Sequence, residues 1–307
     1  MKEKEFIETI KSVTGSKYIG DDCAYIEDLG IVLTQDNLVE DVHFKLDFTT
    51  PYKLGCKSAA VNISDICASG AKPAYLTIAL SLPDNIDTDF IKEFYEGAAC
   101  GNVEIAGGDI TGGDKIFISV SAVGSAAGRR ISSRSHARAG YKVIVSGEHG
   151  SSAAGLRLLN VLEGGPEFPA GIPAGCALIN AHLTPKAQCE FSEQIARQIN
   201  EDYAMMDSSD GLMDALSAIA QASGVMLCID FDKIPYNKDI EQFADYKDLI
   251  LYGGEDYQLI AAVPEKLLKK IKNYTIIGEV KDGTPGVEIN GKFYTRQDIE
   301  TRLYDHF

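Results

Sequence analysis

Apolar runs that end abruptly in acidic residues recur along this chain of 307 residues. The first run, residues 31–33, fits a short buried strand, and its polarity reverses within residues 34–44. We expect Asp36 where this strand ends, with His43 in the segment that follows. Because ligands of α/β sheets bind outside the carboxyl ends of strands, Asp36 is placed for chemistry. A charged exit from a strand has the same pattern and stays open as the alternative.

The same pattern, an apolar run followed by acidic residues, occurs twice in the second half of the chain. Asp207 and Asp210 follow the apolar residues 204–206, and Glu255 stands beside paired glycines after residues 249–252. A helix predicted from residue 210 could use Ser209 or Asp210 as its cap, but a cap does not explain Asp207 as well. The repetition therefore favours a site built from several acids.

A helix is predicted over residues 52–69, after Pro51 and before Gly70. Its polar residues fall on one stripe, and small or apolar residues cover most of the remaining surface. The pattern predicts a largely buried helix whose polar stripe faces a hydrated or ion-containing site. A stripe that faces bulk solvent is the alternative. The stripe consists of Ser58, Asn62, Asp65 and Ser69.

Periodicity and breakers predict the remaining elements. Further helices are expected at residues 3–13, 88–100, 185–200, 210–222 and 266–271. Another helix is expected to follow residues 146–152 and to run through residue 162. Strands are expected at 73–82, 103–106, 116–123, 142–145, 225–231, 258–263, 274–280 and 287–289, and a loop at 163–174.

Two glycine-rich segments could approach a ligand closely. Residues 107–114 place Asp109 between glycines, which either let backbone amides reach a ligand or form a turn into the next strand. Residues 146–152 join a strand to a helix, a geometry that can take an anion. They lack the ending of a P-loop and the spacing of a dinucleotide fingerprint.

The only dense arginine cluster lies within residues 125–140, where a domain boundary would suit. Guanidinium groups favour a clamp on phosphate oxygens, and a solvated linker is the alternative. The cluster consists of Arg129, Arg130, Arg134 and Arg138.

Composition and charge argue against some classes of function. The net charge of −16 argues against a general binder of nucleic acid or membrane surfaces. Acids that line a phosphate site would need metal ions between them and the ligand. Seven cysteines without a CxxC pair, no signal peptide and no membrane-spanning apolar run predict a cytoplasmic protein with reduced thiols.

From about residue 19 to the end, the chain resembles the thiamine-monophosphate kinases. The run of residues 253–257 and the ending separate this family from the aminoimidazole ribonucleotide and selenophosphate synthetases. The motifs that carry the resemblance, in the family's order, are residues 20–24, Asp36 with His43 and Phe44, residues 61–65, 107–109, 152–156, 207–211, 253–257 and the ending 304–307.

The resemblance implies a fold of two α/β domains, here residues 1–137 and 138–307, with the N-terminal sheets of two subunits pairing into a barrel across a homodimer. It also implies ATP and several magnesium ions in a groove lined by acids. Carried over by position, the expected metal ligands are Asp22, Thr34, Gln35, Asp36, Asp65, Asp109, Asp207 and Asp210. The expected ATP contacts are Gly108, Asp109, Arg134 and Ser209, and the expected contacts to thiamine phosphate are His43, Glu255 and Thr301.

Two positions depart from the family pattern. Gln35 replaces a threonine that offers a backbone or hydroxyl oxygen to a metal, a task a carbonyl could perform. Thr301 replaces an aromatic residue that stacks on thiamine. Either a nearby aromatic residue such as Phe293 or Tyr294 takes its place, or this protein binds thiamine more weakly.

The activity implied is magnesium-dependent, direct in-line transfer of the γ-phosphoryl group of ATP to thiamine monophosphate. Because the acceptor is an anionic phosphate oxygen, no catalytic base is expected. Two alternatives remain: another ATP-dependent enzyme of the superfamily with a different small substrate, which Thr301 favours, and a catalytically inactive nucleotide-binding protein. The latter predicts loss of the acids, all of which are present.

Overall fold

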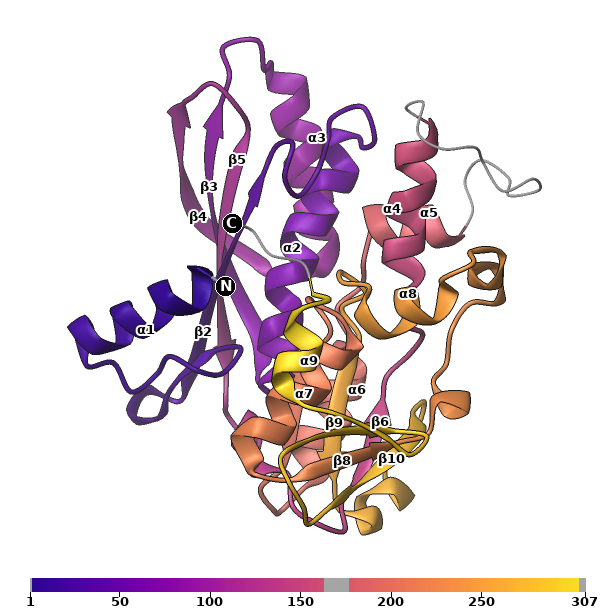
Figure 1. Cartoon of the computed structure of the whole chain (residues 1–307). Coiled ribbons are helices and arrows are strands. Elements are labelled where there is room, and N and C mark those ends of the chain that lie inside the picture. The colour runs from indigo at the N-terminus through magenta and orange to yellow at the C-terminus, as the bar shows by residue number, and fades with distance from the viewer. Residues whose placement is uncertain (1, 163–176, 304–307) are drawn as a thin grey trace.

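The computed structural model describes residues 2–162 and 177–303 (Figure 1). The predicted loop at 163–174 and the family-like ending at 304–307 lie outside the described residues. No helix within the described ranges is long and apolar enough to cross a membrane.

The first half of the chain forms a five-stranded mixed sheet. Its strands alternate between buried side chains on one face, such as Val32 and Ile118, and more exposed side chains on the other. Helices α2 (Pro51–Ala68) and α3 (Thr88–Ala98) cover the buried face (Figure 1). In spatial order the strands are β1 (Ala24–Ile26), β2 (Ile31–Val39), β5 (Phe117–Ser125), β3 (Lys72–Leu82) and β4 (Glu104–Gly112).

The second half forms a seven-stranded mixed sheet. Helix α7 (Leu212–Ser223) packs on one face, against Val143 and Val145, whereas Ile144 points to the other face, toward α2 and α6 (Cys189–Gln198). Both faces of the sheet are therefore covered. In spatial order the strands are β12 (Lys292–Tyr294), β11 (Gly286–Ile289), β8 (Met226–Ile229), β10 (Thr275–Lys281), β6 (Lys142–Val145), β9 (Leu259–Val263) and β7 (Ala204–Asp207).

Helix α2 lies between the two sheets and contacts strands of both. Thr50 caps its start by accepting a hydrogen bond from the Lys53 N–H, and Pro51 occupies the first turn. Small residues allow close packing: a Cβ at Gly55 would collide with the Phe94 carbonyl of α3. Ser58 and Asn62 are fully buried, so the prediction of a largely buried helix is confirmed and the alternative of a solvent-facing stripe is wrong.

The remaining helices lie around the two sheets, except α1, which projects to the left, away from α2 (Figure 1). They are α1 (Lys2–Thr14), α4 (Ser151–Leu162), α5 (Ala177–Leu183), α8 (Tyr246–Tyr252), α9 (Arg296–Glu300) and the 3-10 turns η1 (Glu27–Leu29), η2 (Ala99–Gly101), η3 (Arg134–His136), η4 (Phe231–Lys233), η5 (Lys238–Gln242) and η6 (Glu265–Lys269).

Strand pairing overrides local sequence at two places: it makes the prediction for Asp36 wrong and excludes one of the two alternatives for residues 107–114. Strand β2 pairs with β5 along nine residues, so Asp36 lies inside the strand and not at its end. The glycines at 107 and 108 lie within β4, which pairs with β3, and form no turn.

The predicted helix at 185–200 begins later, at Cys189, and the one at 266–271 is the 3-10 turn η6. Residues 249–252, described only as an apolar run, belong to helix α8.

Candidate functional site

Three elements bring the carboxylates of Asp22, Asp65 and Asp207 together, with one ligand oxygen of each within 4.8 Å of the others. Asp22 precedes β1, Asp65 belongs to α2, and Asp207 ends β7. The two sheets and the helix between them therefore meet at these acids, which we call the acid cluster.

Hydroxyl and guanidinium donors surround the acid cluster. The Thr34 hydroxyl donates to Asp65 Oδ2 at 2.6 Å, and the Ser64 hydroxyl donates to Asp207 Oδ2 at 2.5 Å. Arg134 donates from a terminal guanidinium nitrogen to Asp22 Oδ1 at 2.7 Å. One cation for three carboxylates leaves an excess of negative charge.

Burial and mutual repulsion raise the pKa values of these acids. Burial, followed by the charge of Asp22, raises the pKa of Asp207 to about 7. Burial and the charges of Asp36, Asp207 and Asp22 raise the pKa of Asp65 well above its usual value. Burial is also the main cause of the raised pKa values of Asp22 and Asp36. Oxygen ligands with uncompensated negative charge fit a hard divalent cation.

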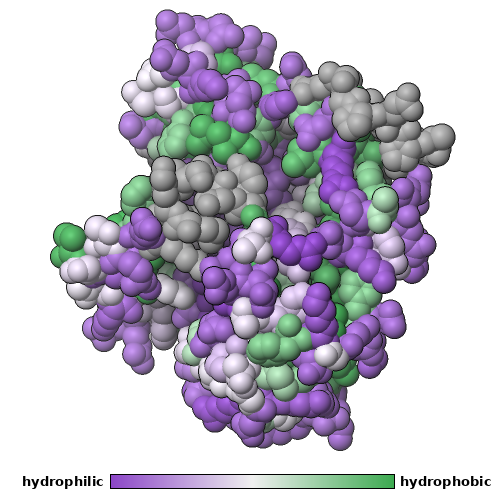
Figure 2. All heavy atoms as spheres, in the orientation of Figure 1, coloured by the Kyte–Doolittle hydropathy of each residue, from purple (hydrophilic) through white to green (hydrophobic). Residues whose placement is uncertain are grey.

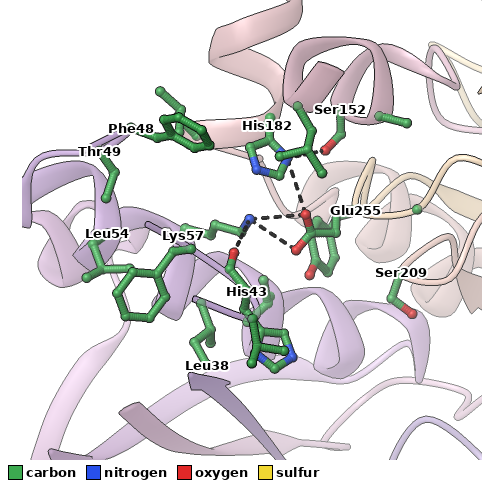
Figure 3. A pocket seen from close by; sticks show the side chains of 18 of the residues that line it. Leu38, His43, Phe48, Thr49, Leu54, Lys57, Ser152, His182, Ser209 and Glu255 are labelled. Atoms are coloured by element: carbon green, nitrogen blue, oxygen red, sulfur yellow. Dashed lines mark hydrogen bonds and ion pairs between the residues drawn. The ribbon is translucent and has the colours of Figure 1, made fainter. Parts of the chain in front are cut away.

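A cavity of about 540 Å³ opens beside the acid cluster and includes Asp36 and Asp65 in its lining. From the other side, His43, Lys57 and Glu255 line it (Figure 3). The cavity therefore joins the predicted metal ligands to two of the three predicted substrate contacts.

Glu255 is held in an unusual backbone conformation. Its φ is 64°, and its N–H donates to the Ser209 carbonyl at 2.7 Å. Gly254 makes this close approach possible, because a Cβ there would lie 2.7 Å from the same carbonyl oxygen. Such strain in a non-glycine residue is common at functional sites.

Charged and polar neighbours surround the Glu255 carboxylate (Figure 3). Lys57 Nζ lies 3.0 Å from Oε1, and His182 Nδ1 lies 3.2 Å from Oε2. Burial raises the pKa of Glu255, but the charge of Lys57, and at low pH that of protonated His182, outweigh it and hold the pKa below its usual value. Glu255 is therefore an anion at neutral pH.

His182 is neutral under the same conditions, because burial and the Lys57 charge lower its pKa to about 4. Its Nδ1 also lies 3.0 Å from the Ser152 hydroxyl. Serine and glutamate thus contact the same ring nitrogen, whereas a serine nucleophile relay needs both nitrogens. The trio is a binding arrangement and not a hydrolytic triad.

His43 lies at the edge of the cavity. Its Nδ1 accepts a hydrogen bond from the Val39 N–H at 3.0 Å. In the neutral imidazole the proton is therefore on Nε2, which makes that nitrogen a donor.

Other predicted site residues lie in different places. Gln35 bonds to Ser119 and Ser121 on the outer face of the first sheet, so only its main chain is near the acid cluster. Asp109 pairs with Ala79, on that same outer face, and Gly108 is next to it in β4. Within this chain the structure does not bring Asp109 to the acid cluster.

Ser209 and Asp210 line the cavity. Thr301 follows α9, is exposed and donates to the Asp298 carbonyl. Neither Thr301 nor its proposed substitutes Phe293 and Tyr294 belong to the cavity lining. The aromatic residues in the lining are Phe44, Phe48, Tyr252 and Tyr257.

The expected anion site at the start of α4 is filled by the chain itself. Asp256 accepts hydrogen bonds from the N–H groups of Gly150 at 2.5 Å and Ser152 at 2.8 Å. Burial raises the pKa of Asp256 to about 7 despite these bonds. The geometry that could take an anion is therefore present, and an internal carboxylate occupies it.

The arginine cluster separates in space. Arg130 and Arg138 pair with Asp202, and Arg129 pairs with Glu193. Only Arg134 of the four reaches the acid cluster.

Sequence reasoning missed Lys57 and His182. Lys57 adjoins the polar stripe of α2 without belonging to it, and His182 lies in α5, which was not predicted. No motif marks either residue, and only the folded chain brings them to Glu255.

Comparison with known proteins agrees with this geometry. Residues 20–126 match the family described as AIR synthase related protein, N-terminal domain. Thiamine-monophosphate kinase of Aquifex aeolicus is 36% identical, with 98% of this chain and 96% of the relative covered. The enzyme of Bacillus subtilis is 33% identical, with 94% and 93% covered.

Among solved structures, AaThiL complexed with AMPPCP and TMP is similar, with a TM-score of 0.86, 36% identity and coverage of 99% of this chain and 97% of that chain. A hydrogenase maturation protein HypE, at 19% identity and a TM-score of 0.68, shares the fold. With two relatives above 30% identity over nearly their whole length, the chain belongs to the thiamine-monophosphate kinase family.

Proposed function

We propose that this protein transfers the γ-phosphoryl group of ATP to the phosphate of thiamine monophosphate, giving thiamine diphosphate and ADP. The supporting observation is the junction of the acid cluster with the cavity that holds Glu255 and His43. A phosphoryl donor bound through cations would meet there an acceptor that carries a positive ring and an anionic phosphate.

Magnesium fits the acid cluster, because carboxylates and the Thr34 hydroxyl are the oxygen ligands that it prefers. Asp22, Asp65 and Asp207 would hold it, with Asp36 from the adjacent strand. Bound magnesium neutralises the charge that phosphoryl groups carry during transfer.

The protein's own residues would then position the two substrates. The Glu255 carboxylate suits the positive thiazolium ring of the acceptor, and the Nε2–H of His43 suits its phosphate. Arg134 reaches Asp22 and is available next to the nucleotide phosphates. An anionic acceptor oxygen needs no base, so transfer would depend on position and charge neutralisation.

We also propose that the chain divides near residue 137 and works as a homodimer in which two first sheets meet. The outer face of that sheet exposes Leu33, Tyr75 and Phe117, and β4 is a long, exposed edge strand. Helix α1 adds exposed apolar side chains, among them that of Val13. Hydrophobic residues are visible at the left edge of the molecule, where this helix lies (Figure 2). Asp109 lies on this face, so it would act in the site of the partner subunit.

The direct test is incubation with ATP, magnesium and thiamine monophosphate, followed by chromatography for thiamine diphosphate. We expect the diphosphate to form in equal amount to ADP, and none to form when EDTA is added. ADP without diphosphate, or neither product, would contradict the proposal.

One observation favours a second candidate, a related ATP-dependent kinase with another acceptor. Thr301 does not supply the aromatic surface typical of the family, and it lies outside the cavity lining. Offering thiamine itself and other small phosphate acceptors in the same assay separates the two candidates.

A further inference from the structure

We propose that Lys57 is a positioning residue of the acceptor site, because its ammonium group ties both substrate-contacting segments, Glu255 and the main chain at His43, to helix α2. This inference rests on the proposed function. It extends that function by assigning a role to a residue that touches neither reacting phosphate.

The ammonium group has three acceptors. Lys57 Nζ lies 3.0 Å from Oε1 and 3.2 Å from Oε2 of Glu255, and 3.4 Å from the His43 carbonyl oxygen (Figure 3). The ammonium group therefore bridges the Glu255 carboxylate and the main chain at His43.

Burial gives these contacts their strength. The Lys57 side chain is only 4% exposed, whereas that of Glu255 is 28% exposed and reaches the cavity. A buried ammonium needs a paired anion, and a hydrogen bond between charged groups is stronger than one between neutral groups. The pair is therefore oriented: the lysine is the fixed partner and the carboxylate faces the ligand space.

The position of Lys57 in the fold makes it a link between the two halves of the chain. It belongs to α2, the helix between the sheets, while Glu255 follows α8 in the second half and His43 follows β2 in the first. Glu255 has a positive φ, a conformation that needs support from its surroundings. His182, on the other side of the carboxylate, completes this support.

A direct role of Lys57 in binding the acceptor phosphate fits less well. The Lys57 side chain is only 4% exposed, and withdrawing its ammonium group would leave the Glu255 carboxylate without its cation. Lys57 therefore acts through Glu255 and His43.

The test compares kinetic constants of the full-length protein. Lys57→Met should raise KM for thiamine monophosphate by about 10- to 100-fold, the range expected for losing a hydrogen bond to a charged group. KM for ATP should stay within about twofold, since the acid cluster does not contact Lys57. A purely structural role would instead lower the active fraction, and so kcat, while leaving both KM values unchanged.

A second pair of variants tests whether Lys57 acts through Glu255. If it does, Lys57→Met in a Glu255→Gln background should add less than about twofold to the acceptor KM, because the two residues form one unit. This double variant removes both charges and avoids an unpaired buried carboxylate. Lys57→Arg keeps the charge and should give an acceptor KM between those of the wild type and Lys57→Met.

Arg296→Met is the matched control. Arg296 also pairs with a buried carboxylate, that of Asp214, but neither residue lines the cavity. We expect it to lower the melting temperature and leave both KM values unchanged.

An unchanged acceptor KM in Lys57→Arg and Lys57→Met, or multiplicative effects in the double variant, would overturn the inference while the wild type still makes thiamine diphosphate. A wild type that makes none would instead overturn the proposed function. If Lys57→Met does not fold, the double variant and Lys57→Arg decide the matter.

Discussion

The Ser64 hydroxyl donates a 2.5 Å hydrogen bond to Asp207 Oδ2 and joins helix α2 to the last residue of strand β7. Asp207 is fully buried, and Asp22 and Asp65 lie beside it. The Ser64 and Thr34 hydroxyls and the Arg134 guanidinium do not balance three carboxylates, so the acid cluster is a costly feature of the metal-free protein. Stability is given up here for a site that cations can fill.

Replacing Asp65 with asparagine should separate activity from stability. In the proposed function Asp65 is a metal ligand, so we expect turnover to fall by more than about 100-fold, since removing such a ligand costs at least as much as removing a residue that supports one. Without metal, the melting temperature should rise, because one repelling charge is gone. Steady-state kinetics and thermal unfolding in EDTA measure the two effects.

Asp245→Asn is the matched control for this variant. Asp245 is an exposed carboxylate paired with Arg157, far from the acid cluster in the chain. We expect no gain in stability and normal turnover. Near-normal activity in Asp65→Asn would contradict the metal-bridge arrangement.

The metal-free protein should lose stability as the pH rises. Asp207 keeps its proton up to about pH 7 in the native state, compared with 3.8 for the reference group. Between pH 3.8 and about pH 7 the native state holds this proton and the unfolded state does not, so the free energy of unfolding falls as the pH rises. Above about pH 7 the stabilising contribution of the protonated Asp207 is lost. Melting temperatures at pH 5.5 and pH 8, with EDTA and with magnesium, check this.

Magnesium should raise the melting temperature more at pH 8 than at pH 5.5, because cations bind the deprotonated carboxylates. Asp207→Asn should show a weaker pH dependence in EDTA than the wild type. An identical pH dependence in both proteins would show that Asp207 is not the responsible group.

Much of the acid cluster could be predicted, because Asp22, Asp65 and Asp207 each stand in short motifs that a resemblance can carry. Their meeting point depends on three elements folding around α2. Lys57 and Glu255 are 198 residues apart, and the local sequence around neither residue predicts that they pair. Buried helix α2 was predictable because its small and apolar residues leave only one polar stripe.

Other features were decided by tertiary contacts. Glycines at 107 and 108 are compatible with a turn or a strand, and pairing with β3 selected the strand. Likewise, the strand–turn–helix pattern at 146–152 suits any anion, and only the fold shows that Asp256 occupies it.

Replacing Asp256 with alanine should destabilise the protein. Two buried N–H groups, of Gly150 and Ser152, would lose their acceptor, and an unsatisfied buried group costs about 1–3 kcal/mol. We expect a loss of about 2–4 kcal/mol in the free energy of unfolding, measured by urea denaturation, because the helix start partly relaxes.

Asp87→Ala is the control, since Asp87 caps α3 on the surface by accepting from the Phe90 N–H. Losing an exposed cap should cost about 1 kcal/mol. Equal losses in the two variants would mean that burial adds nothing to the role of Asp256.

Mixing two inactive variants tests the proposed dimer. If Asp109 acts in the partner's site, Asp65→Asn and Asp109→Asn should each be inactive alone. Each mixed dimer would combine an intact Asp65 from one subunit with an intact Asp109 from the other, so one of its two sites is complete.

Random exchange makes half of the dimers mixed, so the recovered activity should approach about a quarter of the wild-type value. Mixing Asp65→Asn with Asp207→Asn is the control, because both residues belong to the acid cluster of one chain. That pair should recover nothing, since every site then lacks a ligand. Equal recovery in both mixtures, or none in either after proven subunit exchange, would place Asp109 outside the partner's site. Recovery in the first mixture alone would explain why Asp109 lies on the outer face of its own sheet, whereas Asp36 lies on the inner face.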